Sequence, residues 1–351
     1  MESEIYFGRE GRLAIITLNR PKALNSLTLH MIREMQIQLE TWADDPDVGA
    51  VLLQGAGEKA FCAGGDVVAV SLAAKEGGDL TRVFFREEYI LNRTMKTYNK
   101  PLLALIDGIT MGGGVGISVH GSHRIVGDRT LFAMPETGIG LFPDVGGSYF
   151  LPRLPGRLGQ YLALTGARLK AADCIYCEVG TDYIVEERME AALAALANAK
   201  LGADANAEID DIIEGFASDV GEAPLAEYRE AIDRCFASDD VAEVFAALAA
   251  DGSDWAQKTL AKLTAMSPLS LLVTEEEMRR GAEMSFDDCM TMEYRLSQAF
   301  MAGHDFHEGI RALLIDKDKA PKWQHGSIHE VSPAEVETYF APLGDRDLTF
   351  N

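Results

Sequence analysis

Two carboxylate residues lie in an apolar segment that carries no basic side chain. Residues 134–147 read MPETGIGLFPDVGG, which places Glu136 and Asp144 eight positions apart, and neither Lys nor Arg occurs from Leu131 to Pro152. An apolar setting removes water from a carboxylate and raises its pKa, which suits a group that takes up and releases protons near neutral pH. The segment therefore predicts acid–base chemistry. The structural alternative is that Asp144 caps a turn and Glu136 starts a helix.

Two glycine clusters could hold a substrate through the backbone. Residues 61–67 read FCAGGDV and residues 107–116 read DGITMGGGVG, and each follows an apolar run and precedes a helical pattern. Glycine is favoured where the backbone needs an unusual angle or where another group approaches closely. Two such junctions side by side could offer two N–H donors to one developing oxyanion. The alternative is a pair of tight turns with close packing of helix on strand.

Motifs for several other chemistries are missing from the chain. It contains neither the Gly-Lys-Ser/Thr of a phosphate loop, nor a G-x-G-x-x-G dinucleotide fingerprint, nor a G-x-S-x-G nucleophile elbow. Cys174 and Cys177 have C-x-x-C spacing, but no second pair follows at zinc-site spacing, so we interpret them as one face of a helix. We predict no metal, because the histidine pairs have no third ligand at metal-site spacing: His120/His123 and His304/His307.

Composition and charge exclude several classes of protein. The 351 residues include 47% hydrophobic residues, enough for a large core, and carry a formal net charge of −23. Binding to nucleic acid is not expected, because a phosphate backbone needs a basic surface. No apolar run approaches the roughly 18 residues of a membrane span. The first residues show no apolar signal core and no Arg-rich leader, so we expect a cytoplasmic protein.

The hydrophobic pattern predicts an α/β protein in two parts. Up to about Gly180, apolar strands at residues 12–18, 48–54, 102–106 and 123–127 alternate with helical patterns such as residues 29–43. Beyond Gly180 the strand signals fade, and helices are expected at 186–201, 207–216, 225–236, 241–250, 255–265, 269–281 and 290–302. We therefore predict a strand-containing core at residues 1–185 and a helical C-terminal region at 186–351, packed on the core.

Taken together, four ordered segments resemble the crotonase (enoyl-CoA hydratase/isomerase) superfamily. They are NRPKALNSL at residues 19–27, FCAGGDV at 61–67, MGGGVG at 111–116 and MPETGIGLFPDVGG at 134–147, with a weaker match, DFHEGIRA, at 305–312. The resemblance covers residues ~5–180 well and implies a spiral of ββα units with an enlarged helical C-terminal region. The superfamily favours trimers, so a homo-oligomer is expected unless the enlarged region blocks that arrangement.

The resemblance also implies a site for an acyl-coenzyme A substrate. The backbone N–H groups of Gly65 and Gly113 would form the oxyanion hole. Coenzyme A is then part of the substrate, and no separate cofactor is expected. The residues implied to contact it lie in the matched segments: Lys22, Ala23, Ala63, Gly64, Asp66 and Gly112. Arg20, Lys22 and Lys59 flank these loops and could meet the phosphates, although isolated surface cations are more often only solvated.

Departures from the family pattern indicate which reaction the site performs. Typical hydratases carry a catalytic Glu two positions after the triple glycine, where this chain has Gly116, whereas their second Glu matches Glu136. Asp144 replaces a glycine of the hydratase turn. The Glu136–Asp144 pair instead resembles the 3-hydroxyisobutyryl-CoA hydrolase branch, which implies thioester hydrolysis in valine catabolism. Glu136 would be general base or nucleophile, and Asp144 would orient water or the substrate, or protonate the leaving thiolate.

Two alternatives to hydrolysis stay open from the sequence. One is hydration or isomerisation of another acyl-CoA, with Glu136 acting alone. The other is a protein that binds coenzyme A without catalysis.

Overall fold

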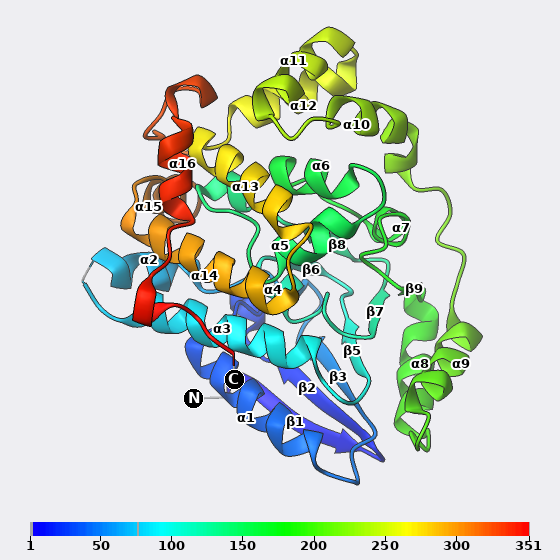
Figure 1. Ribbon diagram of the computed structural model, residues 1–351. Coiled ribbons are helices and arrows are strands. Elements are labelled where there is room, and N and C mark those ends of the chain that lie inside the picture. Colours follow the sequence, from blue (N-terminus) through cyan, green and yellow to red (C-terminus); the bar gives the residue numbers. More distant parts are fainter. Residues whose placement is uncertain (1–2, 76, 351) are drawn as a thin grey trace. The chain divides into compact units, whose positions relative to one another are not determined.

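The chain folds into two compact units, each assembled from several parts of the sequence. The structure is a computed structural model that describes residues 3–75 and 77–350 (Figure 1). Unit 1 contains the segments Met1–Gly65, Ile90–Ala133 and Arg168–Ala226, and unit 2 contains Asp66–Tyr89, Met134–Ala167 and Glu227–Asn351. The division predicted from sequence, between residues 1–185 and 186–351, stays a prediction.

All strands of the described residues belong to unit 1. The larger sheet contains, in this order, β1 (Ile5–Glu10), β2 (Leu13–Leu18), β3 (Ala50–Gly55), β5 (Leu102–Leu105), β7 (His123–Val126) and β9 (Asp182–Tyr183). The smaller sheet contains β4 (Ala60–Cys62), β6 (Ile109–Met111) and β8 (Leu131–Ala133). Only the β1–β2 pair is antiparallel among these described strands. Parallel neighbours need long crossover connections, which explains the alternation of strands and helices in the sequence and confirms the predicted α/β class.

Helices of unit 1 pack on its two sheets. They are α1 (Leu29–Ala43), α4 (Gly113–Gly116), α7 (Ala171–Tyr176), α8 (Glu186–Ala197) and α9 (Ala205–Phe216), and α3 (Leu80–Lys96) reaches unit 1 from residue 90 onward. The prediction of a helix at 29–43 is confirmed, and Thr28 caps it by accepting a hydrogen bond from the N–H of Met31 at 3.2 Å. The helix predicted from Gly112 is only four residues long, because glycine is a poor helix former.

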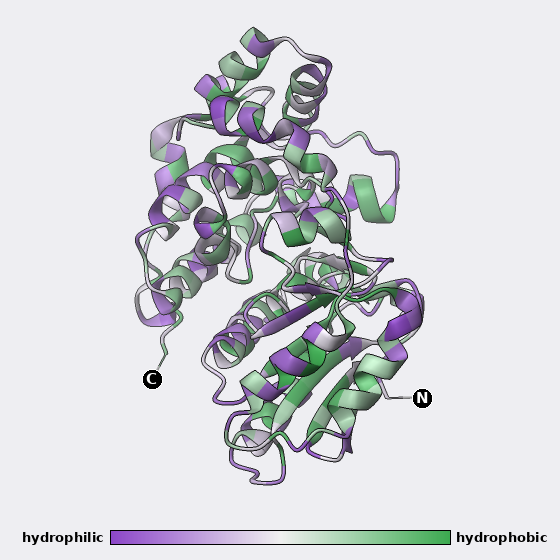
Figure 2. Cartoon of the chain, turned by 90° about the vertical axis from the view of Figure 1, so that its right-hand side faces the viewer, coloured by the Kyte–Doolittle hydropathy of each residue, from purple (hydrophilic) through white to green (hydrophobic). Residues whose placement is uncertain are grey.

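The core of unit 1 forms between the strands of the larger sheet and the helices α8 and α9. Strand residues such as Leu52 and Leu103 pack with Leu196 and Ile209 of α8 and α9, and all four are at most 2% exposed. Figure 2 shows the strands mostly in green, whereas the helices carry purple and green residues on different sides. Strand β1 is missing from the sequence predictions because only its first three residues, Ile-Tyr-Phe, are apolar and most of its residues are exposed.

Among the described residues of unit 2, the regular elements are all helices or helical turns, joined by loops. The unit contains α2 (Val67–Lys75), the first part of α3, α5 (Gly147–Phe150), α6 (Leu158–Thr165), α10 (Arg229–Cys235), α11 (Val241–Asp251), α12 (Asp254–Thr264), α13 (Pro268–Gly281), α14 (Phe286–Ala302), α15 (Asp305–Ile310) and α16 (Pro333–Tyr339). The helices predicted beyond Gly180 are confirmed within a few residues. The one expected at 225–236 begins as the 3₁₀ turn η4 (Pro224–Tyr228) before α10.

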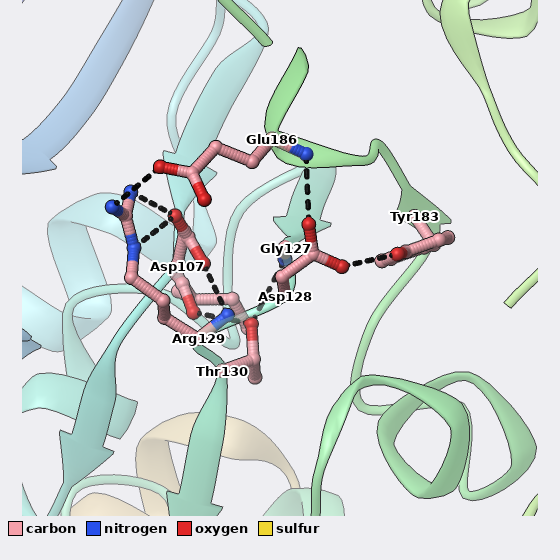
Figure 3. Close-up of polar contacts among 8 residues, drawn as sticks. Asp107, Gly127, Asp128, Arg129, Thr130, Tyr183 and Glu186 are labelled. Carbon is pink, nitrogen blue, oxygen red and sulfur yellow. Dashed lines mark hydrogen bonds and ion pairs between the residues drawn. The ribbon is translucent and has the colours of Figure 1, made fainter. Parts of the chain in front are cut away.

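A polar network fixes the turns that lead into β6 and β8. Arg129 donates from its backbone N at 2.9 Å and from Nε at 3.0 Å to the two oxygens of Asp107, and from Nη1 to Glu186 at 3.1 Å (Figure 3). Asp128 accepts hydrogen bonds from the Tyr183 hydroxyl and, at 2.9 Å, from the backbone N–H of Glu186. The network therefore joins the β5–β6 and β7–β8 connections to β9 and to the start of α8.

We expect Asp107→Asn to lower the free energy of unfolding by about 2 kcal/mol, because an amide cannot accept from both the backbone and the guanidinium of Arg129. Urea unfolding measures this loss. The control is Glu186→Gln, whose carboxylate is 61% exposed and whose removal should cost less than about 1 kcal/mol. Equal losses for the two variants would contradict the role assigned to Asp107.

Candidate active site

The two glycine clusters approach each other within unit 1. Strand β4 leads into Gly64 and Gly65, and the neighbouring strand β6 leads into Gly112 and Gly113. A Cβ atom placed on Gly64 would lie 3.7 Å from the backbone nitrogen of Gly113 and 3.3 Å from the carbonyl oxygen of Met111. Gly64 has φ +111° and Gly112 has φ +49°, angles that side-chain-bearing residues rarely adopt. The clusters therefore bring two backbone turns into contact.

The N–H groups predicted for the oxyanion hole remain available as donors. Gly113 is the first residue of α4, so its N–H has no acceptor inside that helix. Within residues 3–75 and 77–350, the N–H of Gly65 donates to no protein acceptor. Gly114 allows α4 to lie against β4, because a Cβ there would be 2.1 Å from the carbonyl oxygen of Cys62. The structure thus places Gly65 and Gly113 in adjacent turns with unused donors.

Two of the predicted cations line one pocket of unit 1. The pocket has a volume of about 510 Å³, and its lining includes Lys22, Lys59 and Glu58, all exposed. Arg20 differs, because its guanidinium donates to the carbonyl oxygen of Ser26 at 2.7 Å and lies 3.3 Å from Glu4. Lys22 and Lys59 can therefore meet an anionic ligand, whereas Arg20 holds its own loop.

The other residues predicted to contact coenzyme A serve the backbone of their loops. The N–H of Ala63 donates to the carbonyl oxygen of Leu24 at 3.0 Å, and the exposed Ala23 ends the 3₁₀ turn η1 (Pro21–Ala23). In unit 2, the Asp66 carboxylate accepts from the N–H of Ala69 at 3.3 Å and so caps α2. The structure contains no ligand, so binding by Ala23, Ala63, Gly64, Asp66 and Gly112 stays a prediction.

The two predicted carboxylates are both buried in unit 2. Glu136 begins the 3₁₀ turn η2 (Glu136–Ile139) and is 4% exposed, and Asp144 precedes a tight turn and is 5% exposed. Asp144 Oδ2 accepts a hydrogen bond from the hydroxyl of Tyr89 on α3 at 2.8 Å. Among the described residues, Glu136 Oε2 has no hydrogen-bond partner. Glu136 does start a helical turn, as the structural alternative proposed, and its Oε2 atom accepts from no described residue.

Burial and mutual repulsion raise the pKa values of this pair. Burial raises the pKa of Glu136 well above its usual range, and the charge of Asp144 raises it further. Burial also raises the pKa of Asp144 to about 7, against the opposing effect of the Tyr89 hydrogen bond. Since the two carboxyls repel each other, the pair holds a proton near neutral pH. The hydrogen bond from Tyr89 favours the charged form of Asp144, whereas no described residue donates to Glu136 Oε2.

Three further buried glutamates belong to the same electrostatic group. Glu88 of α3, Glu277 of α13 and Glu293 of α14 are at most 2% exposed, and we call these three with Glu136 and Asp144 the acid cluster. Burial is the largest cause of the raised pKa of each of the three, and Asp144 adds to each of them. Both oxygens of Glu277 lack a partner among the described residues, so no hydrogen bond offsets the burial that raises its pKa.

The segment of the weaker sequence match near the C-terminus packs against the turn that begins at Glu136. A Cβ on Gly309 of α15 would lie 2.2 Å from the carbonyl oxygen of Ile139, and one on Gly140 would lie 2.3 Å from that of Asp305. Asp305 itself is buried and accepts from Ser267 at 2.6 Å. The DFHEGIRA segment is therefore a packing surface for η2, which explains why glycine is needed at two facing positions.

Sequence reasoning missed several residues of this region. Tyr89, Glu88, Glu277 and Glu293 lie in amphipathic helices, where a polar residue usually faces water. The 3.6-residue periodicity places Glu88 and Tyr89 beside apolar neighbours, but it cannot show that a distant loop packs on them. Asn25 had a clearer signal, since it lies in the NRPKALNSL match; its side chain donates to the carbonyl oxygens of Ala56 and Ala60, both at 2.9 Å.

Metal and thiol chemistry find no support in the part of the chain that is described. No group of three or more His, Cys, Asp or Glu side chains there is arranged to hold a metal ion. All five cysteines are buried free thiols, and Cys174 lies in α7 with Cys177 directly after it, as expected for one helix face. Burial raises the pKa of the Cys174 thiol, which makes it a poor nucleophile.

Comparison with known proteins shows the family. The model of the enoyl-CoA hydratase/isomerase family matches residues 13–340. A Danio rerio protein named "3-hydroxyisobutyryl-CoA hydrolase, mitochondrial" is 51% identical over 99% of this chain and 91% of its own length. The Homo sapiens protein of the same name is 46% identical with the same coverage.

Solved structures of similar proteins share the fold. A carnitinyl-CoA dehydratase from Mycobacterium thermoresistibile superposes with a TM-score of 0.93 at 43% identity, covering 99% of both chains. An enoyl-CoA hydratase from Rhodobacter sphaeroides 2.4.1 gives 0.91 at 38% identity, covering 99% of this chain and 100% of the other. The fold predicted from the sequence resemblance is thereby confirmed.

The predicted cytoplasmic location is wrong. The relatives that match almost the whole chain are named as mitochondrial proteins. The composition of the first residues is therefore not a sufficient guide to the compartment. In the described part of the chain, no helix is both long and apolar enough to cross a membrane.

The raised pKa of Asp144 predicts how pH changes stability. Because this pKa is about 7 in the folded protein and near 3.8 in the unfolded chain, the folded state keeps a proton that the unfolded state releases. The unfolding free energy then falls as pH rises from about 4 to about 7. Asn has no such proton, so Asp144→Asn should gain at least about 1 kcal/mol relative to the wild type between pH 5 and pH 8. Urea unfolding of both proteins at both pH values measures this, and a constant difference would contradict it.

Proposed function

This chain belongs to the enoyl-CoA hydratase/isomerase family, and we propose that it hydrolyses 3-hydroxyisobutyryl-CoA to the free hydroxy acid and coenzyme A. The observation that carries the proposed reaction is the buried carboxyl pair Glu136–Asp144, whose two members hold a proton between them near neutral pH. The choice of acyl group is supported by relatives of 45–51% identity, which carry the name of that hydrolase and match nearly the full chain. Such a reaction would be a step in valine breakdown.

Hydrolysis of a thioester needs one base and one acid, and the pair can supply both. The charged carboxyl removes a proton from water, whose oxygen forms a bond to the carbonyl carbon. The carbon–sulfur bond then breaks, and the protonated carboxyl gives its proton to the leaving thiolate. Direct attack by Glu136, through a transient anhydride that water opens, gives the same products. In both routes the pair ends with the same number of protons as it began.

The amides of Gly65 and Gly113 are proposed to stabilise the oxyanion that forms on the thioester carbonyl. Loss of one such donor typically costs about 3–4 kcal/mol of transition-state stabilisation. Support comes from the chain order. Gly65 follows β4, Gly113 follows β6 and Glu136 follows β8, and these strands are neighbours in one parallel sheet. Functional groups that follow the carboxyl ends of adjacent parallel strands are a recurring arrangement in α/β enzymes.

Hydration of an enoyl-CoA is the second candidate, because two similar solved structures carry the names of a hydratase and a dehydratase. The residue that argues against it is Gly116, which stands where typical hydratases of the resemblance carry one of their two glutamates. A glycine offers no acid or base at that position. A crotonyl-CoA assay separates the two reactions: hydration removes the conjugated absorbance, whereas hydrolysis releases a free thiol.

We expect Glu136→Gln and Asp144→Asn each to lower kcat for thiol release at least about 100-fold, because each removes one half of the acid–base pair. The measurement is free-thiol release from 3-hydroxyisobutyryl-CoA. The control is hydration of crotonyl-CoA by the same preparations. Full activity in either variant would contradict the mechanism. Hydration of crotonyl-CoA by the wild type without release of a free thiol would favour the second candidate.

An aryl thioester of the same acyl group would assign the two roles. Its leaving thiol is acidic and does not need a proton donor. We therefore expect one of the two variants, the one that lacks the acid, to regain rate with this substrate. Rescue of both variants, or of neither, would contradict the division into one base and one acid.

Binding of the coenzyme A phosphates is proposed at the pocket lined by Lys22 and Lys59. We expect Lys22→Ala and Lys59→Ala each to raise KM about 3- to 10-fold and to leave kcat unchanged, since surface charge pairs contribute about 1 kcal/mol. The control is Arg20→Lys, which should alter stability more than KM. An unchanged KM in the double variant Lys22→Ala/Lys59→Ala would place the phosphates elsewhere.

A further inference from the structure

We propose that Glu293 is a positioning residue for Asp144, because it clamps the turn that follows Asp144 through hydrogen bonds to the backbone N–H groups of Gly146 and Ser148. The proposal deepens the proposed function and rests on it. Glu293 lies on α14, 149 positions from Asp144 in the sequence, and no motif links the two. It does not touch the reacting atoms; it acts through the backbone that carries Asp144.

The clamp consists of three hydrogen bonds to the two carboxylate oxygens. Glu293 Oε2 accepts from the backbone N–H of Gly146 at 2.8 Å, and Oε1 accepts from the backbone N–H of Ser148 at 3.0 Å and from its hydroxyl at 2.5 Å. The Glu293 side chain is completely buried. Three donors directed at one carboxyl group favour its ionised form, and they oppose burial, which raises the pKa of Glu293 to about 8.

The clamped turn has a conformation that its sequence does not favour. Val145, between Asp144 and Gly146, has φ +54°, a left-handed backbone angle that a β-branched residue rarely adopts. Gly146 follows with φ +89°. Such a conformation persists only where its surroundings impose it. Glu293 holds the N–H groups of Gly146 and Ser148, one and three positions after the strained residue.

Two contacts thus constrain Asp144, one at its carboxyl group and one at the backbone that follows it. The Tyr89 hydroxyl fixes Oδ2 at 2.8 Å, and Glu293 fixes the backbone two residues further on. Without the clamp, relaxation of Val145 would rotate the backbone next to Asp144 and withdraw its carboxyl from Tyr89. A small displacement of a reacting group from its productive position is enough to lower the rate markedly.

The test is Glu293→Gln, which keeps the size of the side chain but leaves only one acceptor oxygen. Its NH₂ group would face the N–H of Gly146 or of Ser148, so one side of the clamp is lost. We expect kcat for thiol release to fall about 10- to 100-fold and KM to stay within about twofold, because the substrate-binding groups are untouched. A crystal structure of the variant should show the Asp144 carboxyl displaced from the Tyr89 hydroxyl.

The matched control is Glu275→Gln, the same change at a buried glutamate of α13 that lies outside the acid cluster. Glu275 accepts from Gln160 at 2.7 Å, which a glutamine oxygen can also do, so we expect kcat within about twofold of the wild type. A second test, Ser148→Ala, removes one hydrogen bond of the clamp without leaving a buried donor unpaired. It should lower kcat several-fold and keep the protein folded even where Glu293→Gln does not fold.

Three results would overturn the proposal. They are an unchanged kcat in Glu293→Gln and Ser148→Ala, an equal loss in Glu275→Gln, and a rise of KM that accounts for the whole effect. The wild type is assayed in parallel. A wild type that releases no thiol rejects the proposed function and removes the premise of the clamp, whereas an active wild type with unaffected variants rejects the clamp alone.

Discussion

Burial of acidic side chains without a compensating cation is the constraint on which the rest of unit 2 depends. In the described part of the chain, no Lys, Arg or His is among the groups that shift the pKa of any member of the acid cluster. Isolated charges are costly in such surroundings, so most members must keep their protons. Hydrogen bonds decide which members carry charge: Tyr89 favours it on Asp144, and two backbone N–H groups favour it on Glu293. The result is a group of buried carboxyls with raised pKa values, in which hydrogen bonds favour the charged form at Asp144 and at Glu293.

The two units supply complementary parts of the proposed chemistry. Unit 1 provides adjacent backbone turns whose donors meet no acceptor among the described residues and a pocket with two lysines, and the Asp107–Arg129 network fixes the turns that lead into β6 and β8. Unit 2 provides the carboxyl pair and the helices that bury it. Unit 1 thus acts through the backbone, where glycine permits close approach, whereas unit 2 acts through side chains whose pKa values depend on packing.

Much of this arrangement follows from local sequence. The apolar strands, the Thr28 cap and the glycine junctions are encoded within a few residues, so the α/β class and the elements around Gly65 and Gly113 are predictable. Glu136 and Asp144 were found because their segment lacks any basic residue. The other three members of the acid cluster were not found, since they meet the pair only through tertiary packing. Glu88 lies 56 positions before Asp144, and Glu277 and Glu293 lie more than 130 positions after it. Hydrophobic periodicity assigns such residues to a helix but cannot distinguish a solvent-exposed glutamate from one buried against a distant loop.

The most direct test of the account is the protonation of Asp144 in the resting protein. A ¹³C NMR titration of carboxyl-labelled aspartate, with the signal assigned by its loss in Asp144→Asn, measures it without substrate. The account predicts a resonance that titrates with a midpoint of about 7, far above those of exposed aspartates. A midpoint near 4 would show a solvated carboxylate and would contradict the claim that burial prepares this pair for acid–base catalysis.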